Sequence, residues 1–479
     1  MILPPPHSSR EADSEQPDTT VQLYVVQRVP LAMSVLGMFQ FVLQPDFLEN
    51  LFERFRGLGY EKELSFTKLV EIVGMAITRE PSIHQALKRS RDNQELPVSI
   101  RAFYGKLSRL PMPVSLALLQ EGTQKLQALL PASCAHGVPS CFDGLEVLIV
   151  DGKKSKNVAK RLKACRQEPG RVFGAKLLVC LQARTRLVLA ASAAADGECN
   201  DNPLVPDLLE RMRPRAGKPR LYVFDAQFCD LVQVQNMSGE KAQFAFRHHP
   251  KTHFHADPNR PARTFVDGKG RRLREEWGQL GSAKDPRRCA VRRVTWLRAD
   301  AIHKDLSVVT SLTDSTAYSG EAMVDVYLMR WKIETVFQQV ATVFGLDHLI
   351  GSTPEASAFE TVLCMLMYNA LQVVKAYFAH QQQIALDDVS AQNLFKDVRE
   401  EMLALYKMLP ADKIATHIET PTELIAMRVW LAAQLQGRWT PNWRTARNKT
   451  KRVYAAKPKR SGAHTSIDRL RRKHRKPDT

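Results

Sequence analysis

The chain has 479 residues, which is too long for one simple hydrophobic core and predicts two to four domains. Its 44% apolar and 25% charged residues are typical of a soluble globular protein. The 69 Lys and Arg outnumber the 50 Asp and Glu and give a net charge of +19. This excess favours a polyanionic partner, either nucleic acid or an anionic membrane surface.

No segment predicts a membrane span or a secretory signal. The apolar stretch 29–43 is too short to cross a bilayer, and polar side chains interrupt the stretch 361–379, which predicts a buried helix. Residues 1–20 lack a basic-then-apolar signal pattern. The eight cysteines include no CxxC pair and give little reason to expect disulfides or a zinc knuckle. We therefore expect a cytoplasmic, nucleoid-associated protein.

The N-terminal third is expected to consist of a disordered segment followed by a helical domain. Residues 1–44 are predicted to be mostly disordered, because the first 20 are rich in Pro, Ser and acids. Residues 45–135 are predicted to be helical. Apolar residues recur there at three- and four-residue spacing, first at Phe47, Leu48, Leu51, Phe52 and Phe55. The basic residues of this block could bind a DNA end, although such a domain often serves only in packing.

Two apolar segments that each lead to an aspartate mark the next region, 140–235. Residues 147–150 predict a buried strand that carries Asp151 at its carboxyl end, and residues 220–224 predict another that carries Asp225. The hairpin strands and the helix expected between them span 172–181, 186–193 and 203–213. Adjacent parallel strands would bring the two aspartates into one site.

Residues 236–314 are predicted to form an inserted β-rich subdomain. Its Gly, Pro and Arg content distinguishes it from the preceding strands, and Arg247 is one cation there that could contact a phosphate. The expected strands are Gln243–Phe246, Ala290–Leu297 and Leu306–Thr310.

The run from 327 to 334 places Tyr327, Arg330 and Glu334 three and four residues apart. In one helix these side chains would lie within an arc of roughly 60°, beside an apolar core face. Such a carboxylate can bind a metal ion, and the guanidinium and hydroxyl can bind a phosphate. The alternative is an ordinary ion pair between Arg330 and Glu334, worth about 0.2–0.5 kcal/mol.

Residues 315–350 are predicted to complete the core, and helices are expected through 351–437. Residues 438–479 hold 15 Lys or Arg against two Asp, with Trp439 and Trp443 among them. We predict a flexible basic tail that follows phosphates and whose aromatic rings can stack on bases. The alternative is a solvated tail that only raises solubility.

Together, Asp151, Asp225 and Glu334 suit a phosphoryl-transfer site with two metal ions. Hard divalent ions prefer carboxylate oxygens, one ion activating the attacking hydroxyl and the other stabilising the leaving oxygen. A chain with a charge of +19 would take a polynucleotide as substrate.

The Tyr-x2-Arg-x3-Glu spacing resembles the signature of bacterial insertion-sequence transposases of the DDE class, fourth-insertion-sequence type. Asp151-Gly152 resembles that family's first acid motif and Asp225 with Phe228 its second. The resemblance extends over about residues 45–350. It implies an α/β fold, with a ribonuclease H-like mixed-sheet core, an inserted β subdomain, and flanking N-terminal and C-terminal helical regions.

The resemblance also implies an activity and its partners. Asp151, Asp225 and Glu334 would hold two Mg²⁺ or Mn²⁺ ions, while Tyr327 and Arg330 would contact phosphate. The enzyme would cut the terminal inverted repeats of an element, form and reopen a DNA hairpin, and join the ends to target DNA. A homodimer in a synaptic complex with the DNA, and no membrane, are expected.

Two positions depart from the family pattern. Ala341 stands where the family has a Lys seven residues after its Glu, and Lys332 lies on the wrong helix face to replace it. Ala226-Gln227 follows Asp225 where Arg and Gly are common. Two alternatives remain open: a nuclease of the same fold without strand transfer, and a DNA-binding regulator derived from a transposase. The residues do not specify the terminal repeats, the target preference, the excision route or the oligomer geometry.

Overall fold

The computed structural model describes residues 24–445 and 463–474, apart from 59–62, 79, 81, 93, 95, 97, 133–136, 159, 161, 214–216, 240–241, 299–303, 347–348, 350, 410–413 and 415–419. Residues 1–20, expected to be disordered, lie outside the described residues.

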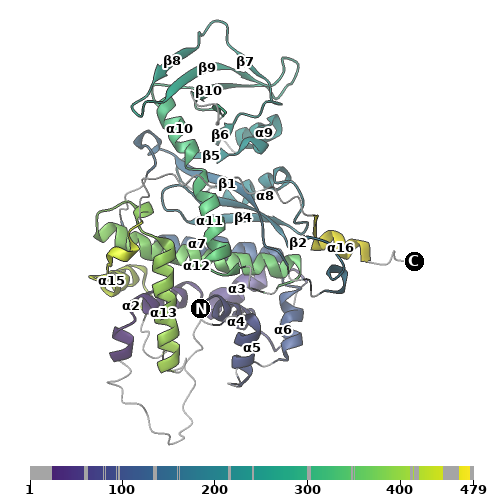
Figure 1. Cartoon of the computed structure of the whole chain (residues 1–479), viewed down its shortest axis with the longest axis vertical. Coiled ribbons are helices and arrows are strands. Elements are labelled where there is room, and N and C mark those ends of the chain that lie inside the picture. The colour runs from purple at the N-terminus through teal and green to yellow at the C-terminus, as the bar shows by residue number, and fades with distance from the viewer. Residues whose placement is uncertain are drawn as a thin grey trace, which may run out of the picture.

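One mixed sheet of ten strands, counted over the described residues, extends from β4 and β1 in the middle of the molecule to β7, β8 and β9 at its top in Figure 1. Its order is β4-β3-β1-β5-β6-β11-β10-β9-β7, and β8 pairs with β9. The strands are β1 Glu146–Lys154, β3 Lys176–Gln182, β4 Val188–Ala194, β5 Arg220–Phe224, β6 Gln243–Arg247, β7 Phe254–Ala256, β8 Arg263–Val266, β9 Arg272–Leu280, β10 Cys289–Leu297 and β11 Leu306–Thr310.

The first five strands of this order form a ribonuclease H-like core. β1 pairs antiparallel with β3, which pairs antiparallel with β4, so the predicted hairpin is present. On its other side β1 pairs parallel with β5, and β5 pairs parallel with β6. The predicted α/β mixed sheet and the adjacency of the two Asp-bearing strands are therefore confirmed.

The inserted strands do not form a separate sheet. β6 falls within the predicted inserted subdomain, but it lies in the core because it pairs with β5. β11 then pairs antiparallel with β6, and β10, β9 and β7 continue the same sheet outward. The predicted boundary at residue 236 is thus too early, since the hydrogen-bonded neighbour of a strand is not visible in its own sequence.

Helices cover both faces of the sheet. Val147 and Ile149 of β1 belong to the apolar core shared with α7, α10, α11 and α12, whereas Leu148 and Val150 face α8 and α9. This alternation is expected for a strand buried on both faces. The helices are α7 Met112–Ala128, α8 Val205–Met212, α9 Leu231–Gly239, α10 Gly320–Leu328, α11 Trp331–Thr342 and α12 Pro354–Gln381.

The long helix α12 forms the centre of the helical part and contacts α7, α11, α2 (Pro30–Val42) and α4 (Phe66–Thr78) (Figure 1). It is long and apolar enough to cross a membrane, but its apolar window is entirely buried inside the protein. The sequence-based prediction of a buried helix here is confirmed. The other helices of this part are α3 Pro45–Phe55, α4 Phe66–Thr78, α5 Ile83–Asp92, α6 Ile100–Leu107, α13 Ala391–Met408 and α15 Leu424–Leu435.

The N-terminal segment is more ordered than predicted. Residues Pro30–Val42 form helix α2, whose apolar side chains are buried against α13, α15 and α12. Glu401 of α13 caps this helix by accepting hydrogen bonds from the amides of Leu31 (2.7 Å) and Ala32 (3.0 Å). The expectation of disorder is wrong for this stretch because the helix is stabilised by distant partners.

The C-terminal tail is also partly folded. Strand β12 (His464–Ser466) pairs parallel with β2 (Arg171–Phe173), and helix α16 (Ile467–His474) follows. Ile467 and Leu470 of α16 are buried in a small apolar cluster with Val158, Cys165 and Val172.

Trp443 is buried and packs against Phe378 of α12, with ring centroids 4.7 Å apart and the ring planes tilted by 46°. The predictions of a wholly flexible tail and of aromatic rings available to DNA are therefore wrong for these residues. Residues 446–462 and 475–479 of the predicted tail lie outside the described part of the chain.

Glu401 generates a prediction about stability. Burial, together with the charge of Asp397, raises the pKa of Glu401 from 4.5 to about 7, although its two amide donors oppose the shift. The folded state then holds the proton more tightly than the unfolded chain. The stabilising contribution is complete below about pH 4.5 and is lost as the pH rises through about 7.

We expect Glu401→Gln to keep the cap but to remove this pH dependence. Urea unfolding between about pH 5 and 8 should show the free energy of unfolding of the wild type falling relative to that of the variant. The exposed neighbour Glu400→Gln serves as the control and should follow the wild type. Parallel curves for wild type and Glu401→Gln would contradict the assignment.

Candidate active site

The parallel pairing of β1 and β5 places Asp151 and Asp225 side by side. Ile149 and Val223 are in register, and each lies two residues before its aspartate. Asp225 follows the last residue of β5, as predicted. Asp151 lies inside β1 and not at its end, because the antiparallel pairing with β3 continues to Lys154. No local pattern predicts this continuation, since Gly152 and the following lysines are not typical strand residues.

Each aspartate is oriented by the amide that follows it. The Gly152 amide donates to Oδ1 of Asp151 at 2.8 Å, and the Ala226 amide donates to Oδ1 of Asp225 at 2.8 Å. For Asp151 the second carboxylate oxygen is thereby left to face the helix junction, whereas Asp225 meets Tyr327 through the same Oδ1 that accepts from the Ala226 amide. The sequence Asp225-Ala226-Gln227-Phe228 starts a short 3₁₀ turn capped in this way.

The polar face from 327 to 334 spans a junction between two helices, in place of the one continuous helix that the spacing predicts. α10 ends at Leu328 and α11 begins at Trp331. At the junction the Arg330 amide donates to the Tyr327 carbonyl (2.9 Å), and the Ile333 amide donates to the Arg330 carbonyl (3.1 Å). These three-residue spacings tighten the chain into a 3₁₀-like turn and still keep the three side chains on the same side.

Arg330 connects this helical junction to the strand that carries Asp151. Its Nη1 donates to Asp151 Oδ2 at 3.1 Å and its Nη2 to Glu334 Oε1 at 2.9 Å. Tyr327 donates its hydroxyl to Asp225 Oδ1 at 3.3 Å. The structure therefore brings together Asp151, Asp225, Glu334, Tyr327 and Arg330. The simple ion pair between Arg330 and Glu334 exists, but it is one arm of a larger network.

Burial changes the acid-base properties of this network. Desolvation raises the pKa of Asp151 to about 6; Arg330 and the Gly152 amide oppose this, while Asp225 and Asp201 add to it. Burial and Asp225 raise the pKa of Tyr327 to about 12. Burial alone would lower the pKa of Arg330, but Asp225, Tyr327 and Asp151 together raise it. The site therefore holds more negative charge than its one buried guanidinium neutralises.

The donor set suits a hard divalent cation. Asp151, Asp225 and Glu334 offer carboxylate oxygens, and burial, with smaller contributions from Asp225 and Asp201, raises the pKa of Asp151, whose ionised form a nearby cation would stabilise. Within the described ranges no three His, Cys, Asp or Glu side chains are already gathered in a metal-holding geometry. The physical reason is visible in the contacts, since the Arg330 guanidinium lies between Asp151 and Glu334.

Arg247 lies at the carboxyl end of β6, beside the end of β5. Phe246 is in register with Phe224, so Arg247 is the next residue along, level with Asp225. Its side chain is exposed, and its charge bears on the pKa of Tyr327. The position is compatible with the predicted phosphate contact.

A fourth acid, Asp201, joins the site and was missed by sequence reasoning. It is buried, pairs with Lys176 of β3 (2.7 Å), and accepts a hydrogen bond from Gln227 two residues after Asp225 (2.7 Å). It also lies against Gly152, where an added Cβ would be 2.1 Å from its Oδ1. The run Asp201-Asn202-Pro203 indicates only a helix start, so no local signal marked this residue.

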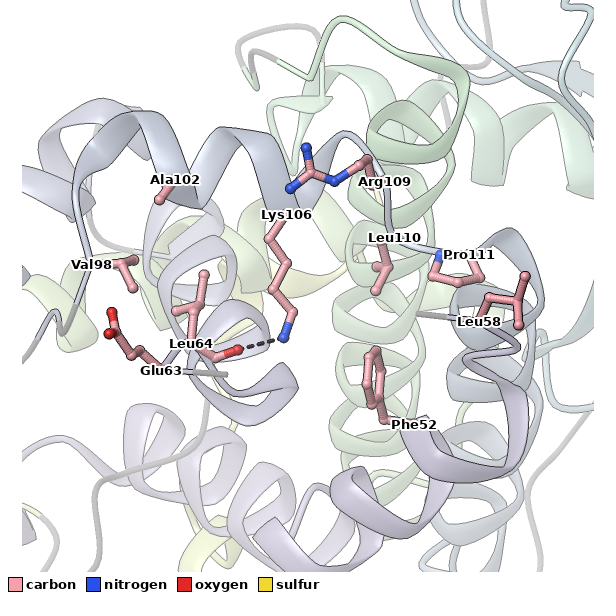
Figure 2. A pocket seen from close by; sticks show the side chains of 10 residues that line it. All are labelled: Phe52, Leu58, Glu63, Leu64, Val98, Ala102, Lys106, Arg109, Leu110 and Pro111. Carbon is pink, nitrogen blue, oxygen red and sulfur yellow. Dashed lines mark hydrogen bonds between the residues drawn. The ribbon is translucent and has the colours of Figure 1, made fainter. Parts of the chain in front are cut away.

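A cavity also lies away from the acids, among the N-terminal helices. It has a volume of about 470 Å³ and is lined by Phe52, Leu64 and Leu110, with Lys106 pointing into it and Arg109 at its edge (Figure 2). Lys106 donates to the Leu64 carbonyl, as Figure 2 shows. None of the acids described above lines this cavity.

Comparison with known families identifies the central part of the chain. Residues 143–370 match a family model described as "Transposase DDE domain". The matched span begins just before β1 and includes Asp151, Asp225 and Glu334. A comparison with curated proteins gives no match. The resemblance found in the motifs is thereby confirmed.

Gly152 provides a test of the packing at the site. In Gly152→Ala the new Cβ would be 2.1 Å from Asp201 Oδ1, and Asp201 is held in place by Lys176 and Gln227. We expect a loss of about 1–3 kcal/mol in the free energy of unfolding, measured by urea denaturation.

Gly144→Ala is the matched control, because nothing lies within 4 Å of its Cβ position. It should be neutral or slightly stabilising, since alanine restricts the unfolded chain. Equal effects of the two substitutions would show that Asp201 does not press on Gly152.

Proposed function

This chain carries a transposase DDE domain, and from that premise we propose that it cleaves the ends of an insertion element and joins them to target DNA. The observation that supports the proposal most strongly is the convergence of Asp151, Asp225 and Glu334, from three separate elements, on Tyr327 and Arg330. Under this proposal the three acids hold two Mg²⁺ or Mn²⁺ ions. When bound, these ions activate the attacking hydroxyl and stabilise the leaving oxygen.

The chain's own residues orient the DNA backbone. Arg330 is buried and fixed by two carboxylates, so it can present its remaining N–H groups to a phosphate with little loss of side-chain entropy. Tyr327 keeps its proton up to a pKa of about 12 and can donate a hydrogen bond at any physiological pH. Arg247 is exposed at the same edge of the sheet and can attract the neighbouring phosphate.

DNA is the proposed partner, and a homodimer on paired element ends is part of the proposal because each end requires an active site. The N-terminal helices from 45 to 135 are proposed to bind the element end. Their exposed cations Arg101 and Arg109 lie on and just after α6.

The buried acids favour an enzyme over a DNA-binding regulator. Placing the carboxylates of Asp151 and Asp201 close together away from water costs free energy, because their charges repel. A protein that only binds DNA would gain nothing in return for this cost. A nuclease that cuts without joining remains the second candidate, and Ala341 favours it because this position offers no cation to hold a phosphate.

Glu334→Gln tests the proposal. The substitution keeps the size and one hydrogen-bond acceptor for Arg330 but removes the charge. We expect Mg²⁺-dependent cleavage of a duplex carrying the inverted repeats that flank the gene to fall by about 100-fold or more, while binding of the same duplex changes only a few-fold.

Glu321→Gln on α10 is the control for that experiment. This carboxylate faces Lys269 of the β8–β9 turn (3.9 Å) and not the acid cluster, so cleavage should be preserved. If Glu334→Gln cut at the wild-type rate, the assignment of the third acid would be wrong.

Helix α16 offers a test of DNA binding. Through His464 it is linked to Glu198 (2.9 Å), which pairs with Lys154 of the strand that carries Asp151. Substituting Arg471, Arg472 and Lys473 by Gln should reduce the slope of log affinity against log salt by about 0.9 for each phosphate that is no longer neutralised. The buried Ile467 and Leu470 remain unchanged, so the helix should stay docked.

The matched control for α16 uses exposed cations of α13, namely Lys396, Arg399 and Lys407. This helix packs on α2 and α12 and not on the strands of the site. An equal change in salt slope for both triple variants would mean that the cations of α16 contribute no more to DNA binding than those of α13.

A further inference from the structure

We propose that Asp387 is a positioning residue of the active site, which acts through Lys332 to fix the orientation of the helix that carries Glu334. The inference rests on the proposed function, because it concerns the placement of the third acid. Asp387 lies outside residues 143–370, so the match to the family model assigns it no role.

The first turn of α11 is held from two opposite sides. Lys332 and Glu334 are the charged residues of this helix, and Arg330 directly precedes it. At about 100° per residue, Lys332 points about 160° away from Glu334. Arg330 pairs with Glu334 at 2.9 Å on one side, and the Lys332 Nζ lies 2.9 Å from Asp387 Oδ2 on the other. These two contacts together restrict rotation of α11 about its own axis.

The carboxylate of Asp387 is itself held by Arg186, which lies in the turn between β3 and β4. Arg186 donates from Nε to Oδ1 at 3.3 Å and from Nη2 to Oδ2 at 3.0 Å, and such a two-point contact fixes the plane of the carboxylate. The Arg186 side chain is only 6% exposed. Burial alone would raise the pKa of Asp387, but Arg186 and Lys332 hold it well below its usual range. Asp387 therefore stays charged at physiological pH.

The backbones on both sides of this contact are anchored as well. Arg186 has a φ of +61°, a left-handed conformation that is uncommon for a residue with a long side chain and that persists where surrounding contacts fix it. Asp387 lies in the short 3₁₀ turn Leu386–Asp388, and its carbonyl accepts a hydrogen bond from Thr445 Oγ1 at 3.1 Å. Asp387 thus connects α11 to an anchored turn at the edge of the sheet.

This connection uses none of the three proposed metal ligands. The other ion pairs at the start of α11 join Arg330 to Asp151 and to Glu334. A divalent cation bound by these carboxylates would compete with Arg330 for their oxygens. The contact between Lys332 and Asp387 lies on the opposite side of the helix and does not compete with a cation, so it can keep α11 in place when the site is loaded.

The first experiment uses the full-length protein, Mg²⁺ or Mn²⁺, and a duplex carrying the inverted repeats that flank the gene. We expect Asp387→Asn to slow single-turnover cleavage by about tenfold and to require more metal ion for half-maximal rate, because Glu334 is less well placed. Binding of the duplex and its salt slope should not change, since a carboxylate makes no phosphate contact. The control Asp207→Asn removes a carboxylate from an ion pair of the same length, 2.9 Å, on the other face of the sheet, and should cut as wild type.

Two further variants test whether Asp387 acts through Lys332. Lys332→Gln should slow cleavage about as much as Asp387→Asn, and the double variant should be no slower than either single variant. Asp387→Glu keeps the charge and should retain cleavage within a few-fold. The Lys332 and Asp387 side chains are each 39% exposed, and such pairs contribute little to stability, so the urea midpoint should stay close to that of wild type.

Hydrogen exchange of the metal-free protein is a second readout that requires no cleavage. Amides of residues 335–342 in α11 should exchange a few-fold faster in Asp387→Asn than in wild type, whereas those of α12 should be unchanged. A general loss of folding would instead accelerate exchange in both helices and lower the urea midpoint. In Asp387→Glu the exchange of α11 should return toward the wild-type rate.

The outcomes distinguish this inference from the proposed function. If Asp387→Asn cuts and exchanges as wild type does, or if the effects of the two single variants add in the double variant, the role of Asp387 is overturned. The same holds if Lys332→Gln lowers the salt slope by about 0.9 while Asp387→Asn cuts normally, because Lys332 is then a DNA contact. If wild type cuts with neither metal ion, the proposed function fails, and the exchange of α11 still decides whether Asp387 holds the helix.

Discussion

The two ion pairs of Arg330 hold the candidate active site together. The guanidinium is buried and lies between a strand and the start of a helix, bound to Asp151 on one and Glu334 on the other. Burying a guanidinium carries a large desolvation cost, which is offset only if carboxylates meet it in good geometry. These two ion pairs therefore hold the α10–α11 junction against β1. They fix the position of Glu334 relative to Asp151 and Asp225.

A second set of contacts holds the two aspartates from the opposite face of the sheet. Asp201 connects Lys176 of β3 with Gln227 of the turn after Asp225, and it presses against Gly152. Arg330 and Asp201 thus approach β1 from its two sides, one as a cation and one as an anion. A glycine after Asp151 is therefore required on the side of β1 that faces Asp201.

The terminal segments that the structure describes contact the rest of the protein through short elements that would not be stable on their own. α2 is capped by Glu401 from 370 residues away, and β12 of the basic tail pairs with β2. Composition alone predicts mobility for both segments. Both segments are ordered because Leu31, Ile467 and Leu470 are buried against parts of the protein that are distant in the sequence. The composition of a segment does not reveal such distant partners.

The sequence by itself indicated the three candidate acids, the class of sheet and the resemblance to DDE-class transposases that the match over residues 143–370 supports. Apolar runs that end at Asp151 and Asp225, and the spacing of Tyr327, Arg330 and Glu334, are local patterns that follow from strand alternation and helical periodicity. Only the tertiary structure decided which side chains face one another. Asp201, the buried partners of Arg330 and the reach of Lys153 to Phe337 depend on strand order and on a turn between two helices. The contacts of Asp201 with Lys176, of Arg330 with Asp151 and of Lys153 with Phe337 join residues separated by 25 to more than 180 positions, so no sequence window could contain them.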